Sequence, residues 1–232
     1  MAGTDREDVP SILRGCRFET ERLLVQELEP TFARWDVGAS SGERSLGLAS
    51  GVVATMLTEE VTRPLPPHWQ GPYSPERAKQ WIADLVGDPM TTLLFAVAKE
   101  GGSAPDETTR GDAEDLSTAS ASMVGLVIAF ELPEEDSASR RCLRLGYLLS
   151  QNFWGQGLAS ELVKGFVSWC RQRNAEEPQG AIASIVGGVA RTNLASKRVL
   201  VKNGFRAVCG ESQEAHSPED QEEEEFCLQL LS

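Results

Sequence analysis

A short glycine-rich segment is the part of this sequence whose composition and setting point most directly to chemistry. It reads WGQGLA (residues 154–159) and lies between a stretch with strand character and a stretch with helical periodicity. Glycine lets a backbone approach an anion closely, and the first N–H groups of a helix have no partner within the helix. The order strand, glycine turn, helix is therefore suited to holding a phosphate group. The hexapeptide alone is equally compatible with a turn in which the glycines serve backbone conformation only.

Two other phosphate-binding motifs do not fit the sequence. A P-loop requires the pattern GxxxxGK[ST], which does not occur. A dinucleotide-binding fold requires GxGxxG and an acidic residue at the end of the second strand. Ser160 occupies the position of the third glycine, and the second strand ends in Gly187 and Gly188, which offer no carboxylate to a ribose. The sequence therefore does not predict a nicotinamide cofactor.

The elements around this segment form a regular series. A strand is expected at 142–150, and the helix that follows extends to about residue 173 with one apolar face made of Leu158, Leu162, Val163, Phe166, Val167 and Cys170. Another strand (181–186) precedes a helix at 193–203 that Gly204 closes. Two final strands, 205–209 and 226–231, are split by an acidic run at 211–225. We expect that run to be a solvated loop, and a weaker alternative is that it attracts cationic amines.

The first half of the chain is less regular. Its expected elements are a loose leader (1–17), a strand (18–28), a helix (45–60), an irregular segment with four prolines (63–73), a helix capped by Ser74, a strand (92–98), a flexible insertion (99–121) and an apolar strand (122–132). The insertion is rich in Gly, Ser, Thr, Asp and Glu and has no periodicity, which is typical of a flexible segment. A single domain over residues 18–231 follows.

Composition excludes several classes of function. The 232 residues carry a net charge of −13, which argues against a nucleic-acid partner. No stretch approaches the roughly 18 apolar residues of a membrane span, and the first ten residues lack an apolar signal core, so we expect a cytoplasmic protein with no membrane partner. The five cysteines are widely spaced and the two histidines are far apart, which indicates reduced thiols and no metal site.

The ordered set of motifs resembles the GNAT superfamily of N-acetyltransferases, in particular the branch that contains the ribosomal-protein alanine N-acetyltransferases. The resemblance lies in QNFWGQGLA (151–159) with its helix, in NLAS (193–196) followed by KNGF (202–205), in TERLL (20–24), and in LGY (145–147). It implies an α/β (α+β) fold with a single mixed, mostly antiparallel sheet of about six to seven strands, flanked by helices and splayed at the coenzyme site. It also implies acetyl-CoA as co-substrate, with no metal.

The resemblance assigns roles by position. The strand end pairs with the pantetheine arm, the glycine loop and first helical turn hold the pyrophosphate, and the second helix contacts the coenzyme across the splay. The implied coenzyme-binding residues are Leu148, Leu149, Ser150, Trp154, Gly155, Gln156, Gly157, Leu158, Ala159, Ser160, Asn193 and Ser196. Trp154 stands where the family usually has Gln or Arg. An asparagine at a helix start is also explained by N-capping alone.

The resemblance leaves the catalytic residues open. Arg144 occupies the position at which related sequences often have an acid. Glu131 is then the substitute candidate for the base, unless it is only an exposed strand-end carboxylate. Ser196 or Tyr147 could donate a proton to the leaving thiolate, and Tyr147 could instead be a packing residue.

The predicted activity is direct transfer of an acetyl group from acetyl-CoA to a primary amine, on a protein N-terminus or a small molecule, by a monomer or homodimer. A catalytically silent acetyl-CoA sensor or scaffold is the alternative from another class, and transfer of a longer acyl group is a third.

Overall fold

The computed structural model describes residues 11–28, 42–99, 123–133, 140–208 and 223–231. Nearly all of the predicted insertion at 99–121 and most of the acidic run at 211–225 lie outside these residues. The same is true of Cys209 and of the first ten residues.

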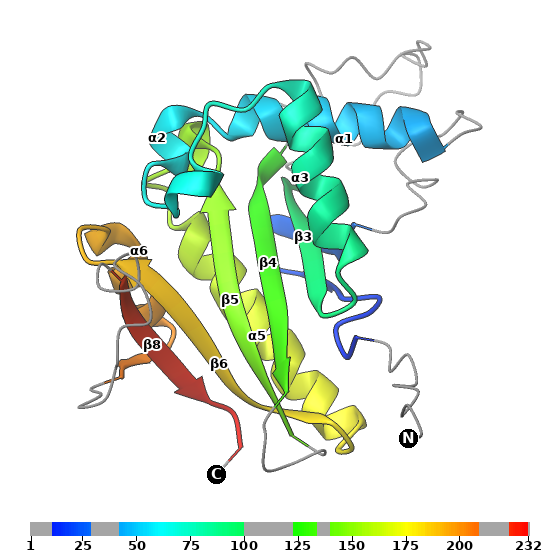
Figure 1. Cartoon of the computed structure of the whole chain (residues 1–232). Helices are drawn as coiled ribbons and strands as arrows, with labels where there is room; N and C mark the ends of the chain where they lie inside the picture. Colours follow the sequence, from blue (N-terminus) through cyan, green and yellow to red (C-terminus); the bar gives the residue numbers. More distant parts are fainter. Residues whose placement is uncertain (1–10, 29–41, 100–122, 134–139, 209–222, 232) are drawn as a thin grey trace, which may run out of the picture.

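One sheet forms the centre of the molecule (Figure 1), with eight strands in the order β1-β2-β3-β4-β5-β6-β8-β7 among the described residues. The strands are β1 (Arg17–Glu19), β2 (Leu23–Glu27), β3 (Thr91–Ala98), β4 (Met123–Pro133), β5 (Arg140–Leu149), β6 (Ala181–Ala190), β7 (Arg206–Ala207) and β8 (Glu223–Gln229). Only β5 and β6 pair in parallel, and every other neighbouring pair is antiparallel. The predicted mixed, mostly antiparallel sheet is therefore confirmed.

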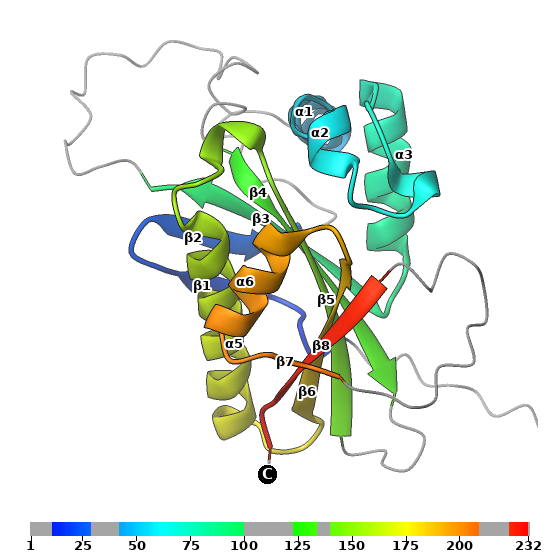
Figure 2. The same cartoon turned by 90° about the vertical axis from the view of Figure 1, so that its left-hand side faces the viewer.

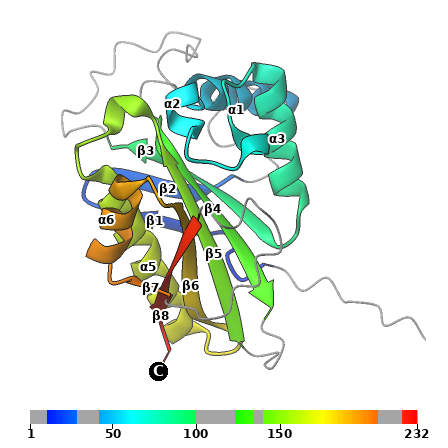
Figure 3. The same cartoon turned by 60° about the vertical axis from the view of Figure 1, so that its left-hand side comes forward.

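Helices cover both faces of this sheet (Figures 2 and 3). On one face lie α1 (Gly42–Met56), α2 (Glu59–Thr62), the 3₁₀ turn η1 (Pro67–Trp69) and α3 (Pro75–Gly87). On the other lie α5 (Leu158–Glu176) and α6 (Leu194–Lys202), and the short 3₁₀ turn η2 (Gln151–Phe153) leads from β5 towards α5. Each face has its own apolar core, and the strands contribute alternate residues to the two: Leu143 and Leu145 of β5 pack towards α5, whereas Leu148 packs towards α3.

Several boundaries differ from the predicted ones for identifiable reasons. The predicted strand at 18–28 is two strands, because the chain turns at Thr20, whose amide donates to the carbonyl of Leu23. The predicted helix at 45–60 is also divided, since the hydroxyl of Thr58 caps α2 by accepting a hydrogen bond from the amide of Val61. Ser74 caps α3 as predicted, through the amide of Arg77.

Two parts of the predicted domain boundaries need correction. The leader was expected to be loose up to residue 17, yet Leu13 and Cys16 are buried in the core. The acidic run was expected to be a loop up to residue 225, yet Glu223–Gln229 forms β8, which lies between β6 and β7. None of the helices in the described part of the chain has the length and apolar character required to cross a membrane.

The sheet opens between β5 and β6. The two strands pair from Arg140 opposite Ala181 to Arg144 opposite Val186. Beyond that point β5 continues to Leu149 and β6 to Ala190 without further pairing between them, and the two strands diverge (Figure 1). The predicted splay is therefore present.

Candidate active site

The glycine-rich loop leads from the end of β5 to the start of α5. Gly155 and Gly157 have φ angles of +73° and +78°, a left-handed conformation that side-chain-bearing residues adopt at a cost of about 1–2 kcal/mol. This conformation lets the chain turn sharply and start the helix at Leu158. Apart from its two chain neighbours, no atom of the described residues lies within 4 Å of the point where a Cβ on Gly155 would be.

The first amides of α5 have no hydrogen-bond partner in the part of the chain that the structure describes. Gly157 is the N-cap and has no side chain to cap the helix. Within the described residues, no hydrogen bond is made to the backbone N–H of Leu158, Ala159 or Ser160. Unpaired donors at a helix N-terminus, next to an open glycine turn, fit the diphosphate group of a coenzyme.

The strand end offers fewer peptide groups than predicted. The amide of Ser150 donates to the carbonyl of Val124 in β4. Because backbone groups alternate in direction along a strand, the amide and carbonyl of Leu148 also point to β4, and only those of Leu149 point to the splay. The carbonyl of Leu149 already accepts a hydrogen bond from the indole Nε1 of Trp154, at 2.8 Å. Of the three residues predicted to pair with the pantetheine arm, Leu149 therefore retains its amide for that purpose.

Two hydroxyl groups meet across the splay. The Oη atom of Tyr147, on β5, lies 2.7 Å from the Oγ atom of Ser196, in the first turn of α6. Burial raises the pKa of Tyr147 to about 12, although the hydrogen bond with Ser196 acts in the opposite direction. Tyr147 is therefore protonated at neutral pH, and its hydroxyl also donates a hydrogen bond to the carbonyl of Ser196, at 3.3 Å. Asn193 caps α6 by accepting a hydrogen bond from the amide of Ser196, so its side-chain oxygen is occupied.

Glu131 does not lie with the other predicted catalytic residues. It is opposite Leu143, whereas Tyr147 is opposite Val127, four residues or about 13 Å away along the strand. Its side chain is buried, and its carboxylate accepts a hydrogen bond from the hydroxyl of Ser11. This position fits a group that fixes the N-terminal segment, and it does not support the predicted role as a base.

Carboxylates do lie at the opening of the splay, on the strand β8. Arg144, which occupies the expected acid position, forms ion pairs with Glu223 at 3.3 Å and with Glu225 at 3.1 Å. Its side chain reaches them across Gly188 of β6, where a Cβ would lie 2.6 Å from Oε2 of Glu223 and 2.7 Å from a guanidinium nitrogen of Arg144. A side chain at position 188 would overlap this ion-pair cluster, which explains the glycine.

The cluster and the hydroxyl pair lie on opposite faces of the sheet. Arg144 and Tyr147 are three residues apart on β5, so their side chains point to opposite sides. The side chains of the cluster remain between 31% and 40% exposed, which leaves them accessible to a second substrate.

The glycine loop is fixed from outside the splay by the β1–β2 hairpin. Arg22 donates from Nη1 to the carbonyl of Gln156, at 3.1 Å, and from Nε to Glu161 in the first turn of α5, at 2.8 Å. The backbone amide of Arg22 and the hydroxyl of Thr20 also donate to the Glu161 carboxylate. Burial raises the pKa of Glu161, but these hydrogen bonds and the charge of Arg22 outweigh it and hold that pKa below its usual value. Gln156 further donates to the carbonyl of Asn152.

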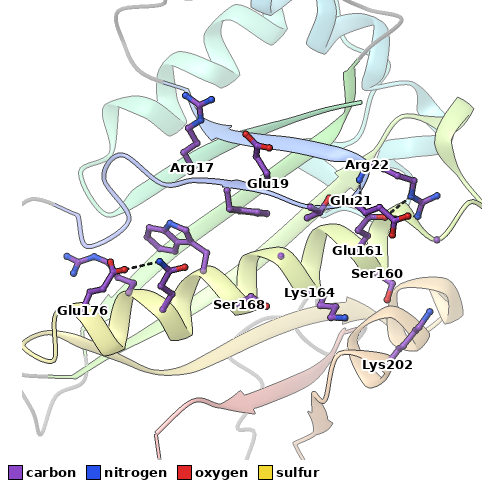
Figure 4. A pocket seen from close by; sticks show the side chains of 17 residues that line it. Arg17, Glu19, Glu21, Arg22, Ser160, Glu161, Lys164, Ser168, Glu176 and Lys202 are labelled. Carbon is purple, nitrogen blue, oxygen red and sulfur yellow. Dashed lines mark hydrogen bonds and ion pairs between the residues drawn. The ribbon is translucent and has the colours of Figure 1, made fainter. Parts of the chain in front are cut away.

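A groove of about 820 Å³ runs between the hairpin and α5 (Figure 4). It contains Gly157 and Ser160 of the predicted coenzyme residues but neither Tyr147 nor Ser196, so it lies beside the splay. Ser160 also contacts α6, because its Oγ accepts a hydrogen bond from Nδ2 of Asn203. No group of three His, Cys, Asp or Glu side chains in the described ranges is arranged to hold a metal ion.

The residues that the sequence analysis missed are those that act over long sequence separations. Arg22 lies within the TERLL motif, which contributed only to the family resemblance. Glu223 and Glu225 lie within the acidic run and were assigned to a loop. Paired glycines at 187–188 inside an apolar strand were the available signal that side chains cross this part of β6.

Comparisons with known proteins agree with this geometry. The family model described as "Acetyltransferase (GNAT) domain" matches residues 49–206. No curated protein matches the sequence. Among solved structures, a probable GNAT acetyltransferase from Chromobacterium violaceum is similar with a TM-score of 0.59 and 14% identity, over 99% of this chain and 93% of that one.

Two further structures have names that specify a substrate. The ribosomal-protein-S5-alanine acetyltransferase from Vibrio fischeri has a TM-score of 0.54 and 14% identity, over 92% of this chain and 96% of its own. RimL, a ribosomal L7/L12 α-N-protein acetyltransferase in complex with coenzyme A, has a TM-score of 0.52 and 13% identity, over 90% and 95%. These identities support a common fold. Since the family model covers more than half of the sequence, the chain belongs to the GNAT family of acetyltransferases.

Proposed function

We propose that this protein transfers an acetyl group from acetyl-CoA directly to a primary amine. The observation that carries the proposal is the splay between β5 and β6, which has unpaired helix amides at its mouth and the Tyr147–Ser196 hydroxyl pair across it. When bound, the thioester supplies an activated acetyl group. The residues of the chain then need only to hold the two substrates, accept a proton and stabilise negative charge.

The Tyr147–Ser196 hydroxyl pair fits the task of stabilising negative charge. An alkyl thiol has a pKa of about 8.5, so Tyr147, with its pKa of about 12, is a weaker acid than the leaving group by more than three pKa units. Complete proton transfer from Tyr147 to a thiolate is therefore unfavourable. We therefore assign Tyr147 and Ser196 as hydrogen-bond donors to developing negative charge, which replaces the predicted role of proton donor.

We assign the proton-accepting task to Glu223 and Glu225. An amine acceptor that reaches the splay from the side of α1–α3 passes these carboxylates, whose charge favours a cationic ligand. In the transfer, the ammonium first gives a proton to a carboxylate, directly or through water. The amine nitrogen then forms a bond to the acetyl carbon, the carbon–sulfur bond breaks, and the thiolate leaves with the electron pair. The nitrogen gives its second proton to the thiolate or to water, which leaves a neutral amide and the thiol of coenzyme A.

The names of two similar structures support a proposal for the class of acceptor. Two of them are named as acetyltransferases of ribosomal-protein residues, and RimL as one that acts on an α-amino group. An α-amino group has a pKa near 7.7–8.0, about two units below that of a lysine side chain, so much more of it is unprotonated at neutral pH. A peptide N-terminus is therefore the first acceptor to test, with small-molecule amines second.

The experiment is a panel of peptides and small amines assayed for release of coenzyme A, with bound coenzyme identified by native mass spectrometry. Turnover with at least one amine, at a rate well above thioester hydrolysis, is the expected result. Bound coenzyme without turnover on any amine would instead support the silent sensor. The same spectra report whether the chain is a monomer or a homodimer and whether longer acyl groups bind.

A further inference from the structure

A carboxylate next to an anion-binding site requires compensation. Glu161 lies in the first turn of α5, beside the unpaired amides that we assign to the coenzyme diphosphate. Its side chain is 16% exposed, so solvent screens its negative charge only in part. An uncompensated charge at this position would repel a diphosphate and weaken binding.

Arg22 supplies the compensation. Nη2 of Arg22 lies 2.7 Å from Oε2 of Glu161, and Nε lies 2.8 Å from the same oxygen. Figure 4 shows the two side chains pointing towards each other from β2's hairpin turn and from α5. The pair brings together residues that are 139 positions apart in the sequence.

The same guanidinium also orients the loop. Nη1 of Arg22 donates to the carbonyl oxygen of Gln156, which precedes Gly157. In a trans peptide the carbonyl and the following N–H point in opposite directions. Holding the carbonyl of Gln156 towards Arg22 therefore turns the amide of Gly157 away from it, and removes an oxygen from the path of an anion.

The hairpin that bears Arg22 is itself firmly seated. Gly165 of α5 has no side chain, and a Cβ there would lie 2.6 Å from the ring of Phe18 and 2.7 Å from the methyl group of Thr20. Lys99 ties the hairpin on its other side, with Nζ at 2.7 Å from the carbonyl of Thr20 and 2.9 Å from Glu19. Arg22 thus projects from a packed support.

We propose that Arg22 is a positioning residue of the coenzyme site, which neutralises Glu161 and directs the carbonyl of Gln156 away from the diphosphate. This inference rests on the proposed function, because it concerns the same loop. It predicts that the harm caused by losing Arg22 comes largely from the charge left on Glu161.

The test compares Arg22→Gln, Glu161→Gln and the double variant in the full-length chain. Calorimetry should show that Arg22→Gln weakens coenzyme A binding on the order of tenfold, since a charge is left uncompensated near a dianion. Glu161→Gln should bind within about threefold of wild type, and the double variant should recover most of the loss. When acetyl-CoA is varied at saturating amine, Arg22→Gln should raise the KM for acetyl-CoA and leave kcat within about twofold.

The matched control is Arg173→Gln, which breaks an ion pair of the same length, 2.7 Å to Glu177, at the other end of α5. It should not change coenzyme affinity, and its melting temperature should fall by no more than that of Arg22→Gln. Equal coenzyme binding by the wild type and all variants would overturn the proposed role of Arg22 and leave the proposed function intact. A double variant as weak as Arg22→Gln would overturn the neutralisation of Glu161 by Arg22. Absence of binding by the wild type would overturn the proposed function as well.

Discussion

Substitution of Gly188 by alanine tests the carboxylates of β8 without removing either of them. The new Cβ would lie 2.6 Å from Oε2 of Glu223 and 2.7 Å from a guanidinium nitrogen of Arg144. Ordinary contacts of a Cβ are 3.4–4 Å, so the ion pair has to move by about 1 Å. A displacement of this size at a catalytic group costs up to about a hundredfold in rate.

The expected cost to folding is much smaller than the cost to turnover. The side chains of Arg144, Glu223 and Glu225 are 31–40% exposed. Ion pairs of that kind contribute about 0.2–1 kcal/mol to the free energy of unfolding. We therefore expect Gly188→Ala to lower kcat between about tenfold and a hundredfold. The melting temperature should fall by only a few degrees, and coenzyme affinity should not change.

Gly187→Ala is the matched control. It replaces the neighbouring glycine of the same strand and restricts the backbone in the same way. Its Cβ, however, points to the opposite face of the sheet, at 3.1 Å from the end of the Leu200 side chain. Steady-state kinetics on the best amine of the panel, together with calorimetry for coenzyme A, separate the two. Equal kcat values for both variants and the wild type would refute the assignment of Glu223 and Glu225 as proton acceptors.

Three further changes have definite expected outcomes. Tyr147→Phe should lower kcat by about a hundredfold, as loss of one donor to developing charge does, with coenzyme affinity within threefold in calorimetry. Because the pKa of Tyr147 is raised to about 12, wild-type stability should decline between pH 10 and pH 12 in a way that this variant does not share, measured by denaturant titration. Gly157→Val should weaken coenzyme binding beyond detection with an intact circular dichroism spectrum, since φ is +78° there; micromolar binding would argue against the loop. Glu131→Gln should keep kcat within twofold and lower the melting temperature, and a hundredfold loss of rate would restore Glu131 as the base.

The half of the fold that surrounds the coenzyme loop was predictable because its signals are local. All six apolar residues of the predicted face of α5 are buried, as a helical period requires. Ser74 and Asn193 cap their helices, and Gly204 has the positive φ expected after a helix end. Each of these features depends on residues within a few positions of one another.

The acceptor side was not predictable in the same way because its pairs are distant in sequence. Arg144 contacts Glu223 and Glu225 at sequence separations of 79 and 81 residues. When these partners are not known, the arginine indicates only that the acid usual at this position is missing. Glu223, Glu224 and Glu225, within a run of four consecutive glutamates, also look like a solvated loop. They form a strand because Arg144 pairs with two of them on one face, while Lys197 pairs with Glu224 on the other, at 2.8 Å. The burial of Glu131 was not predictable for the converse reason, since its partner Ser11 comes from a segment expected to be loose.

The position of Trp154 provides an optical signal for the coenzyme loop. Its indole is 47% exposed while its Nε1 donates to the carbonyl at the end of β5. The other tryptophans of the described ranges lie elsewhere: Trp69 and Trp81 contact each other beside α3, and Trp169 lines the groove on α5. A nucleotide that settles on the loop would change the solvent around Trp154 in particular. The difference in emission between the wild type and Trp154→Phe would then follow occupancy directly, in real time and without a labelled ligand.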